Sequence, residues 1–388
     1  MKSVLSRRSF GFDFTTAAFW AVVSGLTFGL APLANAQESV ASTADAQSEM
    51  ASWQKMVDRS VSYLRLRGQA KDGSFSYATG IGPTGLVVAA LLESGLPPED
   101  PMVSKGLAFL EKHVQKSGGI HTDESLHRNY DTCIAVVAFS KAKQEKYNEI
   151  IARAEQFVRG IQMDESEGKD PSDLDYGGAG YGKHRRPDLS NTSYLVDALK
   201  ELGNGPEDEA IQKALAFVSR CQNLESPYND SPHAAKVNDG GFYYTVANGG
   251  ETKAGTTPNG GLRSYGSMTY AGLKSMIYAG LKPDDIRVQS AVDFLKANYS
   301  LDSNPGMGQQ GLFYYYHTMA KALDALGEAK FQDANGVSHD WKAELRTKLA
   351  EVQQEDGSWV NPTTRWMEGD PNLVSAYALL CLKYCKPL

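Results

Sequence analysis

The sequence is poor in cysteine, in net positive charge and in long apolar runs, and each shortage excludes a class of protein. Its 388 residues include only four cysteines, too few for disulfides to define a fold of this size. Cys381 and Cys385 lie four residues apart in one helix-like run, where a bridge between them is awkward. Cys133 and Cys221 could pair only if the fold brought them together, so we expect buried free thiols.

Positive charge is also in deficit. The chain has 39 Lys and Arg against 46 Asp and Glu, a formal net charge of −7. Because residues 1–36 carry +2, the remainder carries about −9. Nucleic acids and anionic membrane surfaces attract basic proteins. We therefore expect no nucleic-acid partner and no electrostatic attachment to a membrane.

The one long apolar run lies near the N-terminus, at about residues 14–33. It follows a twin-arginine pattern, Ser-Arg-Arg-Ser-Phe at residues 6–10, and precedes Ala-Asn-Ala at residues 34–36. We expect residues 1–36 to be a twin-arginine-type signal peptide that is cleaved on export to the periplasm or the medium, with no permanent membrane span afterwards. A retained anchor is the alternative. The small, polar residues 37–52 are expected to form a disordered leader.

The rest of the chain is organised around a repeated turn. Its clearest copy is QQEDGSW at residues 353–359, in which the glycine lets the chain turn and the aromatic ring anchors the turn. An amphipathic helical pattern precedes each copy and a more apolar helical run follows it. The copies are marked by Gly73, Gly119, Gly178, Gly241, Gly311 and Gly357.

This alternation predicts the fold. A helix that is apolar nearly all round requires burial on both sides, so six amphipathic helices would surround six buried ones. We expect an all-α fold, an (α/α)6 toroid of six helix-hairpin repeats, with residues 53–388 forming a single barrel domain. The alternative is an open solenoid, which would need polar capping repeats at both ends. The last repeat, which contains Tyr-Ala-Leu-Leu-Cys at 377–381, is not polar.

The turns also resemble a known family. The pattern Gln-x-x-Asp-Gly-Ser-Trp at 353–359, with looser copies at 73–75 and 240–242, is similar to the Gln/Trp-type repeat of the squalene–hopene cyclase and protein prenyltransferase superfamily, the prenyltransferase and squalene oxidase repeat. The resemblance covers nearly all of the chain after about residue 53. It implies a central cavity that binds or transforms an apolar ligand, for example an isoprenoid.

Two reactions implied by the resemblance can be compared with the residues. Protonating cyclases use an Asp-x-Asp-Asp motif, which this sequence lacks; Asp131, beside Tyr130, is the best single substitute acid. Prenyltransferases bind zinc through segments that Asp131-Thr132-Cys133 and Tyr316-His317-Thr318 resemble. These belong to repeats two and five, on opposite walls of the ring, whereas zinc ligands must lie about 2 Å from one ion. We expect no metal and no other cofactor, and Asp131 and His317 remain as catalytic candidates.

The ligand-binding candidates come from the starts of the buried helices, which form the mouth of such a barrel. Some of them are good helix caps, and the tyrosines could instead pack between helices. Aromatic rings at matching places in several repeats would suit an apolar or cationic ligand. The candidates are Tyr130, Asp188, Asn191, Tyr194, Tyr265, Tyr315, Tyr316 and Asp370.

Three functions therefore remain open. The first is binding or transformation of an apolar ligand in the cavity, and the second is a non-catalytic binding or scaffold module of the cell envelope. The third is a carbohydrate-active enzyme, which would need two carboxylates at a set separation. Asp188 and Asp370 are the conceivable pair, but in repeats three and six they would face each other across the ring. A hydrophobic small molecule or lipid is the partner that we expect.

Overall fold

We analysed a computed structural model that describes residues 34–182 and 185–387, with side chains from residue 46 onward. The twin-arginine pattern and the apolar run of the predicted signal peptide lie outside the described residues. Residues 46–388 form one compact unit. Among the described residues, no helix is both long and apolar enough to cross a membrane.

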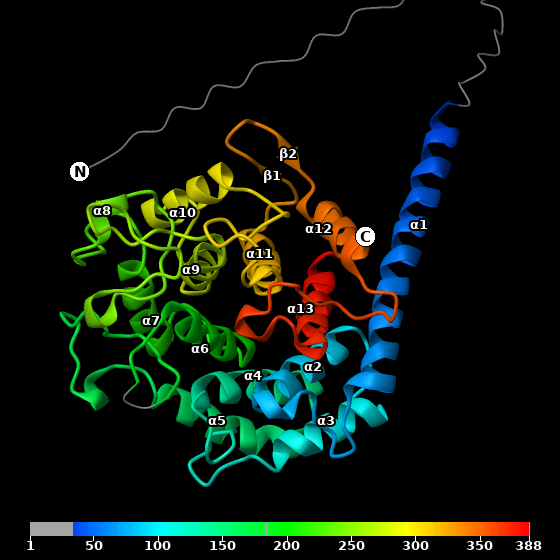
Figure 1. The fold of residues 1–388 in the computed structure, drawn as a ribbon, viewed down its shortest axis with the longest axis horizontal. Coiled ribbons are helices and arrows are strands. Elements are labelled where there is room, and N and C mark those ends of the chain that lie inside the picture. The colour runs from blue at the N-terminus through cyan, green and yellow to red at the C-terminus, as the bar shows by residue number, and fades with distance from the viewer. Residues whose placement is uncertain (1–33, 183–184, 388) are drawn as a thin grey trace, which may run out of the picture. The chain divides into compact units, whose positions relative to one another are not determined.

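The compact unit is a toroid of two concentric layers of helices (Figure 1). Six amphipathic helices lie outside and six apolar helices lie inside, as the alternating pattern predicted. The outer helices are α1 (Ala34–Tyr63), α3 (Pro101–Glu111), α5 (Asn148–Arg159), α7 (Glu209–Arg220), α10 (Ile286–Ala297) and α12 (Trp341–Val352). The inner helices are α2 (Gly82–Glu93), α4 (Arg128–Ala142), α6 (Leu189–Glu201), α9 (Gly266–Tyr278), α11 (Leu312–Leu326) and α13 (Pro371–Tyr384).

A few short elements complete the chain. The four-residue helix α8 (Ala234–Val237) lies in the long loop of the fourth repeat. A small antiparallel hairpin of β1 (Phe331–Gln332) and β2 (Ser338–His339) precedes α12, with Phe331 paired to His339. Neither element contributes an inner wall, so the toroid is helical throughout.

The predicted closure of the ring is confirmed. Each inner helix packs on the next, and α13 packs on α2. The first and last repeats are also joined between the layers, because the Trp53 indole N–H of the outer helix α1 donates to the Leu382 carbonyl of the inner helix α13 over 2.9 Å. The glycine turn of the last repeat contacts α1, since Gln353 Nε2 donates to the Met56 carbonyl over 3.0 Å.

Five of the six turns share one geometry. In each, a glycine of positive φ (77° to 96°) lies against a backbone carbonyl oxygen of the next outer helix. A Cβ on these glycines would come within 1.8 to 2.4 Å of that oxygen, so no larger residue fits without movement. The five glycines are Gly73, Gly118, Gly177, Gly240 and Gly357.

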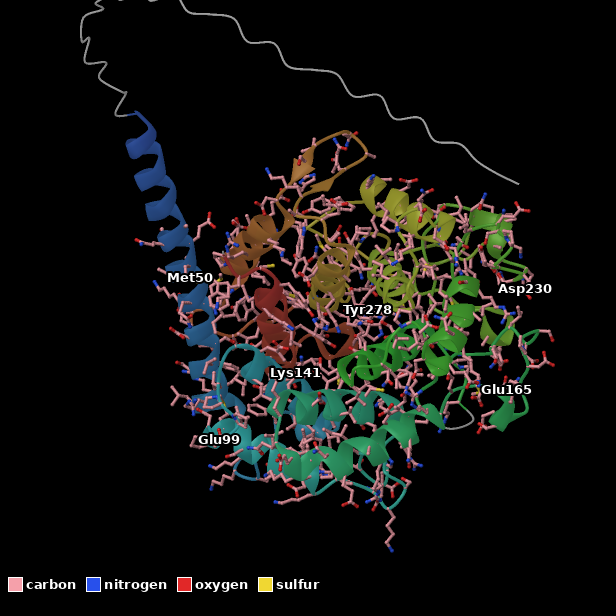
Figure 2. The ribbon with its side chains drawn as sticks, turned by 180° about the vertical axis from the view of Figure 1, so that it is seen from behind. Met50, Glu99, Lys141, Glu165, Asp230 and Tyr278 are labelled. Carbon is pink, nitrogen blue, oxygen red and sulfur yellow. The ribbon has the colours of Figure 1, made fainter. Side chains whose placement is uncertain are left out.

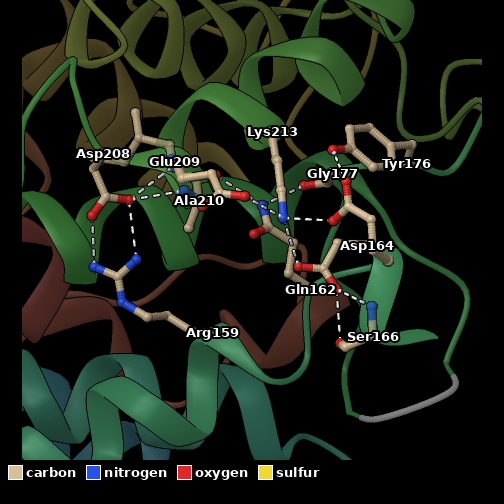
Figure 3. A network of polar contacts seen from close by, with 12 residues as sticks. Arg159, Gln162, Asp164, Ser166, Tyr176, Gly177, Asp208, Glu209, Ala210 and Lys213 are labelled. Carbon is tan, nitrogen blue, oxygen red and sulfur yellow. Dashed lines mark hydrogen bonds and ion pairs between the residues drawn. The ribbon is translucent and has the colours of Figure 1, made fainter. Parts of the chain in front are cut away.

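In four of these turns, the side chain of a preceding glutamine adds hydrogen bonds to the turn and to the next outer helix. Gln162 Nε2 donates to the Gly177 carbonyl and to the Ala210 carbonyl of α7, both over 2.8 Å (Figure 3). Equivalent pairs of bonds come from Gln69, Gln222 and Gln353. The repeat therefore joins neighbouring outer helices through side chain and backbone at once.

The predicted turn markers need correction in four repeats. In the Gly-Gly pairs the first glycine takes the left-handed conformation, so Gly119, Gly178 and Gly241 were each assigned one residue too late. The second glycine of each pair lies instead against an aromatic ring of the following outer helix. Gly311 belongs to a different structure: it caps α11 and faces the ring of Trp366.

Two further expectations concern the ends and the thiols. Residues 37–52, expected to be a disordered leader, belong to α1 in the structure. Residues 34–63 contain neither glycine nor proline, and the alanines, glutamines and glutamates among them favour a helix. All four cysteines are free and buried, as expected.

Candidate functional site

The inner ring encloses a cavity of about 370 Å³ at the N-terminal ends of the inner helices, which we call the tyrosine cavity. Its walls come from the first turns of α4, α6, α9, α11 and α13 and from loops of repeats three, four and six. Its lining residues include seven tyrosines: Tyr130, Tyr181, Tyr194, Tyr244, Tyr265, Tyr314 and Tyr377.

A second hydrogen bond in each turn positions these first helical turns. In these five turns, the N–H two residues after the positive-φ glycine donates to a Thr or Ser hydroxyl near the start of the next inner helix, over 2.9 to 3.1 Å. For example, Phe242 N donates to Thr269 Oγ1 and Trp359 N donates to Ser375 Oγ. Each of these turns therefore contacts both the next outer helix and the first turn of the next inner helix.

The tyrosine rings contact one another across the ring. Tyr130 and Tyr194 meet edge to face with ring centroids 4.9 Å apart. Tyr314 lies 6.4 Å from Tyr194 and 6.0 Å from Tyr377, and its hydroxyl is 3.2 Å from Ser190 Oγ. Burial raises the pKa of Tyr377 to about 12, so this phenol is neutral at physiological pH. The walls therefore offer ring faces and neutral hydroxyls.

Asp131 is the carboxylic acid that the first turn of α4 presents to this cavity. Ser125 Oγ donates to its Oδ2 over 2.6 Å, and only 3% of the residue is exposed. Burial raises the pKa of Asp131 to about 6, although hydrogen bonds from Ser125 and the Gly82 N–H act in the opposite direction. A carboxyl with this pKa can hold or release a proton near neutral pH.

Glu368 is a second buried acid of the cavity, and sequence reasoning missed it. It comes from the loop of repeat six and caps α11, accepting from Tyr314 N over 2.7 Å and from Phe313 N over 3.3 Å. Asn361 Nδ2 also donates to it over 2.7 Å. Burial raises the pKa of Glu368 despite these bonds. A glutamate that caps a helix 55 residues away in the chain leaves no local pattern in the sequence.

Of the ten predicted site residues, five line the tyrosine cavity. Asp188 is a sixth candidate and lies just behind the wall, next to Asn191. The Oδ1 atom of Asp188 caps α6 by accepting from Asn191 N, and the Oδ2 atom of Asp188 accepts from Asn191 Nδ2. Burial raises the pKa of Asp188 to about 6, against the hydrogen bonds from Asn191. The five lining residues are Tyr130, Asp131, Asn191, Tyr194 and Tyr265.

Three other candidates lie outside the cavity. The hydroxyls of Tyr315 and Tyr316 donate to the Ser300 and Leu301 carbonyls in the preceding loop, so both rings pack between helices. Successive residues of an α-helix point about 100° apart, and Tyr314 is the member of this run that faces the cavity. Asp370 caps α13, accepting from Asn372 N over 2.9 Å.

His317 lies deeper in the ring, where it lines a second chamber together with Cys133. The ring of His317 is 5.6 Å from that of Tyr377. Burial, with nearby lysines, holds the pKa of His317 well below its usual range, so the imidazole is neutral. Asp131, the other catalytic candidate, lines the tyrosine cavity instead. Within the described part of the chain, no group of three His, Cys, Asp or Glu side chains is placed to hold a metal ion.

Comparisons with known proteins identify the fold. No protein-family profile and no curated sequence matches the chain. Among solved structures, the unliganded type II terpene cyclase MstE from Scytonema aligns with a TM-score of 0.54 at 13% identity, covering 87% of this chain and 99% of that one. A family 76 glycoside hydrolase from a bovine Bacteroides thetaiotaomicron strain gives 0.54 at 10% identity, over 85% and 77%. A family 88 glycosyl hydrolase from Bacteroides vulgatus gives 0.53 at 12% identity, over 87% and 99%. The chain thus has the terpene-cyclase-like toroid fold, which enzymes of different chemistry share.

Proposed function

We propose that this protein binds a largely apolar ligand of the isoprenoid class in the tyrosine cavity, and that Asp131 is the proton donor for its transformation. The observation that carries the proposal is the convergence of seven tyrosines and two buried acids, Asp131 and Glu368, on a single space. Its volume of about 370 Å³ lies within the range of about 300–1,000 Å³ usual for ligand pockets. Support also comes from MstE, whose structure was solved with geranylgeranyl dihydroxybenzoate as substrate.

The chemistry would begin with a proton transfer. Protonated Asp131 would donate its proton to one carbon of an alkene, leaving a carbocation on the other carbon. Ring faces of Tyr130 and Tyr194 lie next to this acid in the same wall and would stabilise the cation through their π electrons. Loss of a proton from the product cation would then restore the carboxylic acid. The raised pKa is what suits Asp131 to this role, because a general acid must be partly protonated at working pH.

The test begins with the natural ligand. Lipid extraction and mass spectrometry of the protein purified from its native envelope should recover an isoprenoid with the wild type. Tyr314→Ala, which removes a ring from the cavity wall, should retain much less. Tyr228→Ala removes a tyrosine that is 51% exposed and should retain as much as the wild type. Equal retention by all three proteins would contradict the proposed cavity.

Binding and chemistry are separated by Asp131→Asn. This variant keeps a hydrogen-bond acceptor for Ser125 but cannot donate a carboxylic proton. We expect it to retain the ligand and to leave it unconverted, whereas the wild type converts it. Recovery of an oligosaccharide in place of a lipid would instead favour a carbohydrate-active enzyme, and an empty cavity in the wild type would favour a scaffold role.

We also propose that the protein is exported through its twin-arginine segment. The support is the pattern at residues 6–10 and the small residues at 34–36. The mature protein isolated from the producing cell should begin at Gln37, and Arg7→Lys combined with Arg8→Lys should leave it unprocessed. An intact Met1 in the wild-type protein would contradict the proposal.

A further inference from the structure

The inner ring encloses a second chamber, on the side of the C-terminal halves of the inner helices, and the proposed function does not use it. Its volume is about 380 Å³, and we call it the lysine chamber. Lys141 and Tyr278, two of its lining residues, are labelled in Figure 2, which shows the ring from behind. Its charged residues are Glu93, Lys141, Asp197, Lys200, Glu201, Lys321, Asp324 and Lys383.

The chamber has two unlike walls. Its apolar wall comes from α2, α4 and α13, through Leu86, Ala89, Ile134, Val137 and Leu380. Its opposite wall comes from α6 and α11 and carries Asp197, Lys200 and Lys321. A space of this kind fits a molecule with one charged end and one apolar end.

The charges on most of the chamber are balanced. Lys141 pairs with Glu93 and Glu201, and Lys383 pairs with Glu93 over 3.0 Å. Asp324 pairs with Lys342, which does not line the chamber. These groups therefore leave little net charge for a ligand to neutralise.

The wall around Asp197 is not balanced. A single oxygen of Asp197, Oδ2, accepts from both Lys274 Nζ and Lys321 Nζ, each over 2.7 Å. Lys200 Nζ lies over the Tyr278 ring at 5.8 Å and makes no ion pair with any described residue. Two ammonium groups, those of Lys274 and Lys321, thus share one carboxylate, and the neutral His317 beside them adds no charge.

Unused hydrogen-bonding capacity lies at the same place. Asp197 Oδ1 and His317 Nδ1 are buried, and neither has a hydrogen-bond partner among the described residues. The side chain of Asp197 is 9% exposed and His317 is 7% exposed. Buried polar atoms without partners are uncommon and costly. Their convergence on one chamber with excess positive charge is the mark of a ligand site.

We propose that the lysine chamber is a second binding site, which takes a small organic carboxylate. Its anionic group lies against Lys321 and Lys200, and its apolar body lies against α2, α4 and α13. The unpartnered Nδ1 of His317 supplies a further polar contact to the bound carboxylate or to its water. Burial, with a smaller contribution from the Lys321 charge, lowers the pKa of Lys274 to about 8, although Asp197 acts in the opposite direction.

The test is calorimetric titration of the intact protein with sodium hexanoate, compared with hexanol, hexylamine and inorganic phosphate. Hexanoate should bind saturably and more tightly than any of the other three. Lys321→Gln should weaken hexanoate binding at least tenfold, because it removes an ammonium group from the unbalanced wall. Lys348→Gln, which breaks a surface pair with Asp302, should bind like the wild type.

Two further variants keep the test decisive. Val137→Phe fills the apolar wall without touching the charges, so it should abolish binding even if Lys321→Gln fails to fold; thermal melts verify folding. Trp366→Ala alters only the tyrosine cavity and should leave hexanoate binding unchanged. The proposal is overturned if hexylamine binds as well as hexanoate, if Trp366→Ala and not Val137→Phe removes binding, or if the wild type shows no saturable binding.

Discussion

Gly357→Ala probes the contact that closes the ring. Gly357 has a φ of 92°, and a Cβ there would lie 2.4 Å from the carbonyl oxygen of Arg59 in α1. The left-handed conformation costs a non-glycine residue about 1–2 kcal/mol, and forcing an atom into a filled space adds about 1–3 kcal/mol. The expected loss in free energy of unfolding is therefore about 2–5 kcal/mol.

A matched glycine separates the two costs. Gly203 has a φ of 91°, but a Cβ there meets nothing within 4 Å. Gly203→Ala should therefore show the conformational cost alone, about 1–2 kcal/mol. An unfolding entropy of about 2.1 cal/mol/K per residue gives about 1.2 °C per kcal/mol for a chain of this size. Tm should therefore fall by about 1–2.5 °C in Gly203→Ala and by about 2.5–6 °C in Gly357→Ala.

The assay is thermal unfolding followed by circular dichroism, combined with limited proteolysis. In Gly357→Ala the added methyl pushes the last turn away from α1, so protease should cut within α1 earlier than in the wild type. In Gly203→Ala the digestion pattern should not change. Equal loss of Tm in the two variants would refute the reasoning, because it would mean that the turn does not contact α1 closely.

Three other outcomes are expected. Thr269→Val should lower the free energy of unfolding by about 1–3 kcal/mol, because it leaves the buried Phe242 N–H without its acceptor; Thr347→Val, on an exposed side of α12, is the control in the same denaturant titration. Trp53→Phe should cost about 1 kcal/mol through loss of the bond to the Leu382 carbonyl, and a melt at neutral pH measures it. Asp131 has a folded pKa of about 6, above its unfolded value of about 3.9, so its ionisation destabilises the fold as pH rises from 4 to 7. Asp131→Asn should therefore equal the wild type near pH 4 and exceed it by up to about 3 kcal/mol at pH 8, and a constant difference across denaturant titrations at these pH values would contradict the buried acid.

The fold could be predicted from the sequence because its determinants are local. A glutamine, a glycine corner and an anchoring ring lie close together in the first and last repeats, at residues 69–75 and 353–359, so the pattern can be read there without knowing what each copy contacts. The same locality explains the errors. In a Gly-Gly pair the sequence does not say which glycine takes positive φ. The pattern predicts Gly178 as the turn residue, whereas Gly177 has the positive φ and contacts α7.

The candidate site was less predictable because it depends on helical phase and on distant loops. Tyr314, Tyr315 and Tyr316 are equivalent by composition, and only the orientation of α11 decides that Tyr314 faces the cavity. Tyr181, Tyr244 and Glu368 reach the cavity from loops whose paths the sequence does not specify. A further signal in the sequence is the Thr or Ser whose hydroxyl accepts a hydrogen bond from the turn, as Thr84 and Ser375 do. These residues mark which side of an inner helix faces the turn, and they are present in five inner helices.

The direction of the inner helices accounts for the different chemistry of the two cavities. The N-terminal end of a helix is partially positive and the C-terminal end partially negative. At the N-terminal ends Asp188 caps α6 and Glu368 caps α11. Lysines such as Lys141 and Lys383 lie in the last turns, where they pair with glutamates. The caps satisfy backbone N–H groups that would otherwise face an apolar ligand, so the tyrosine cavity can be lined by rings. Lys321 lies mid-helix, remote from either end of α11, and the helix termini do not account for it. That is why the excess charge of Lys274 and Lys321 at Asp197 calls for a ligand, whereas Lys141 and Lys383, which are paired with glutamates, do not.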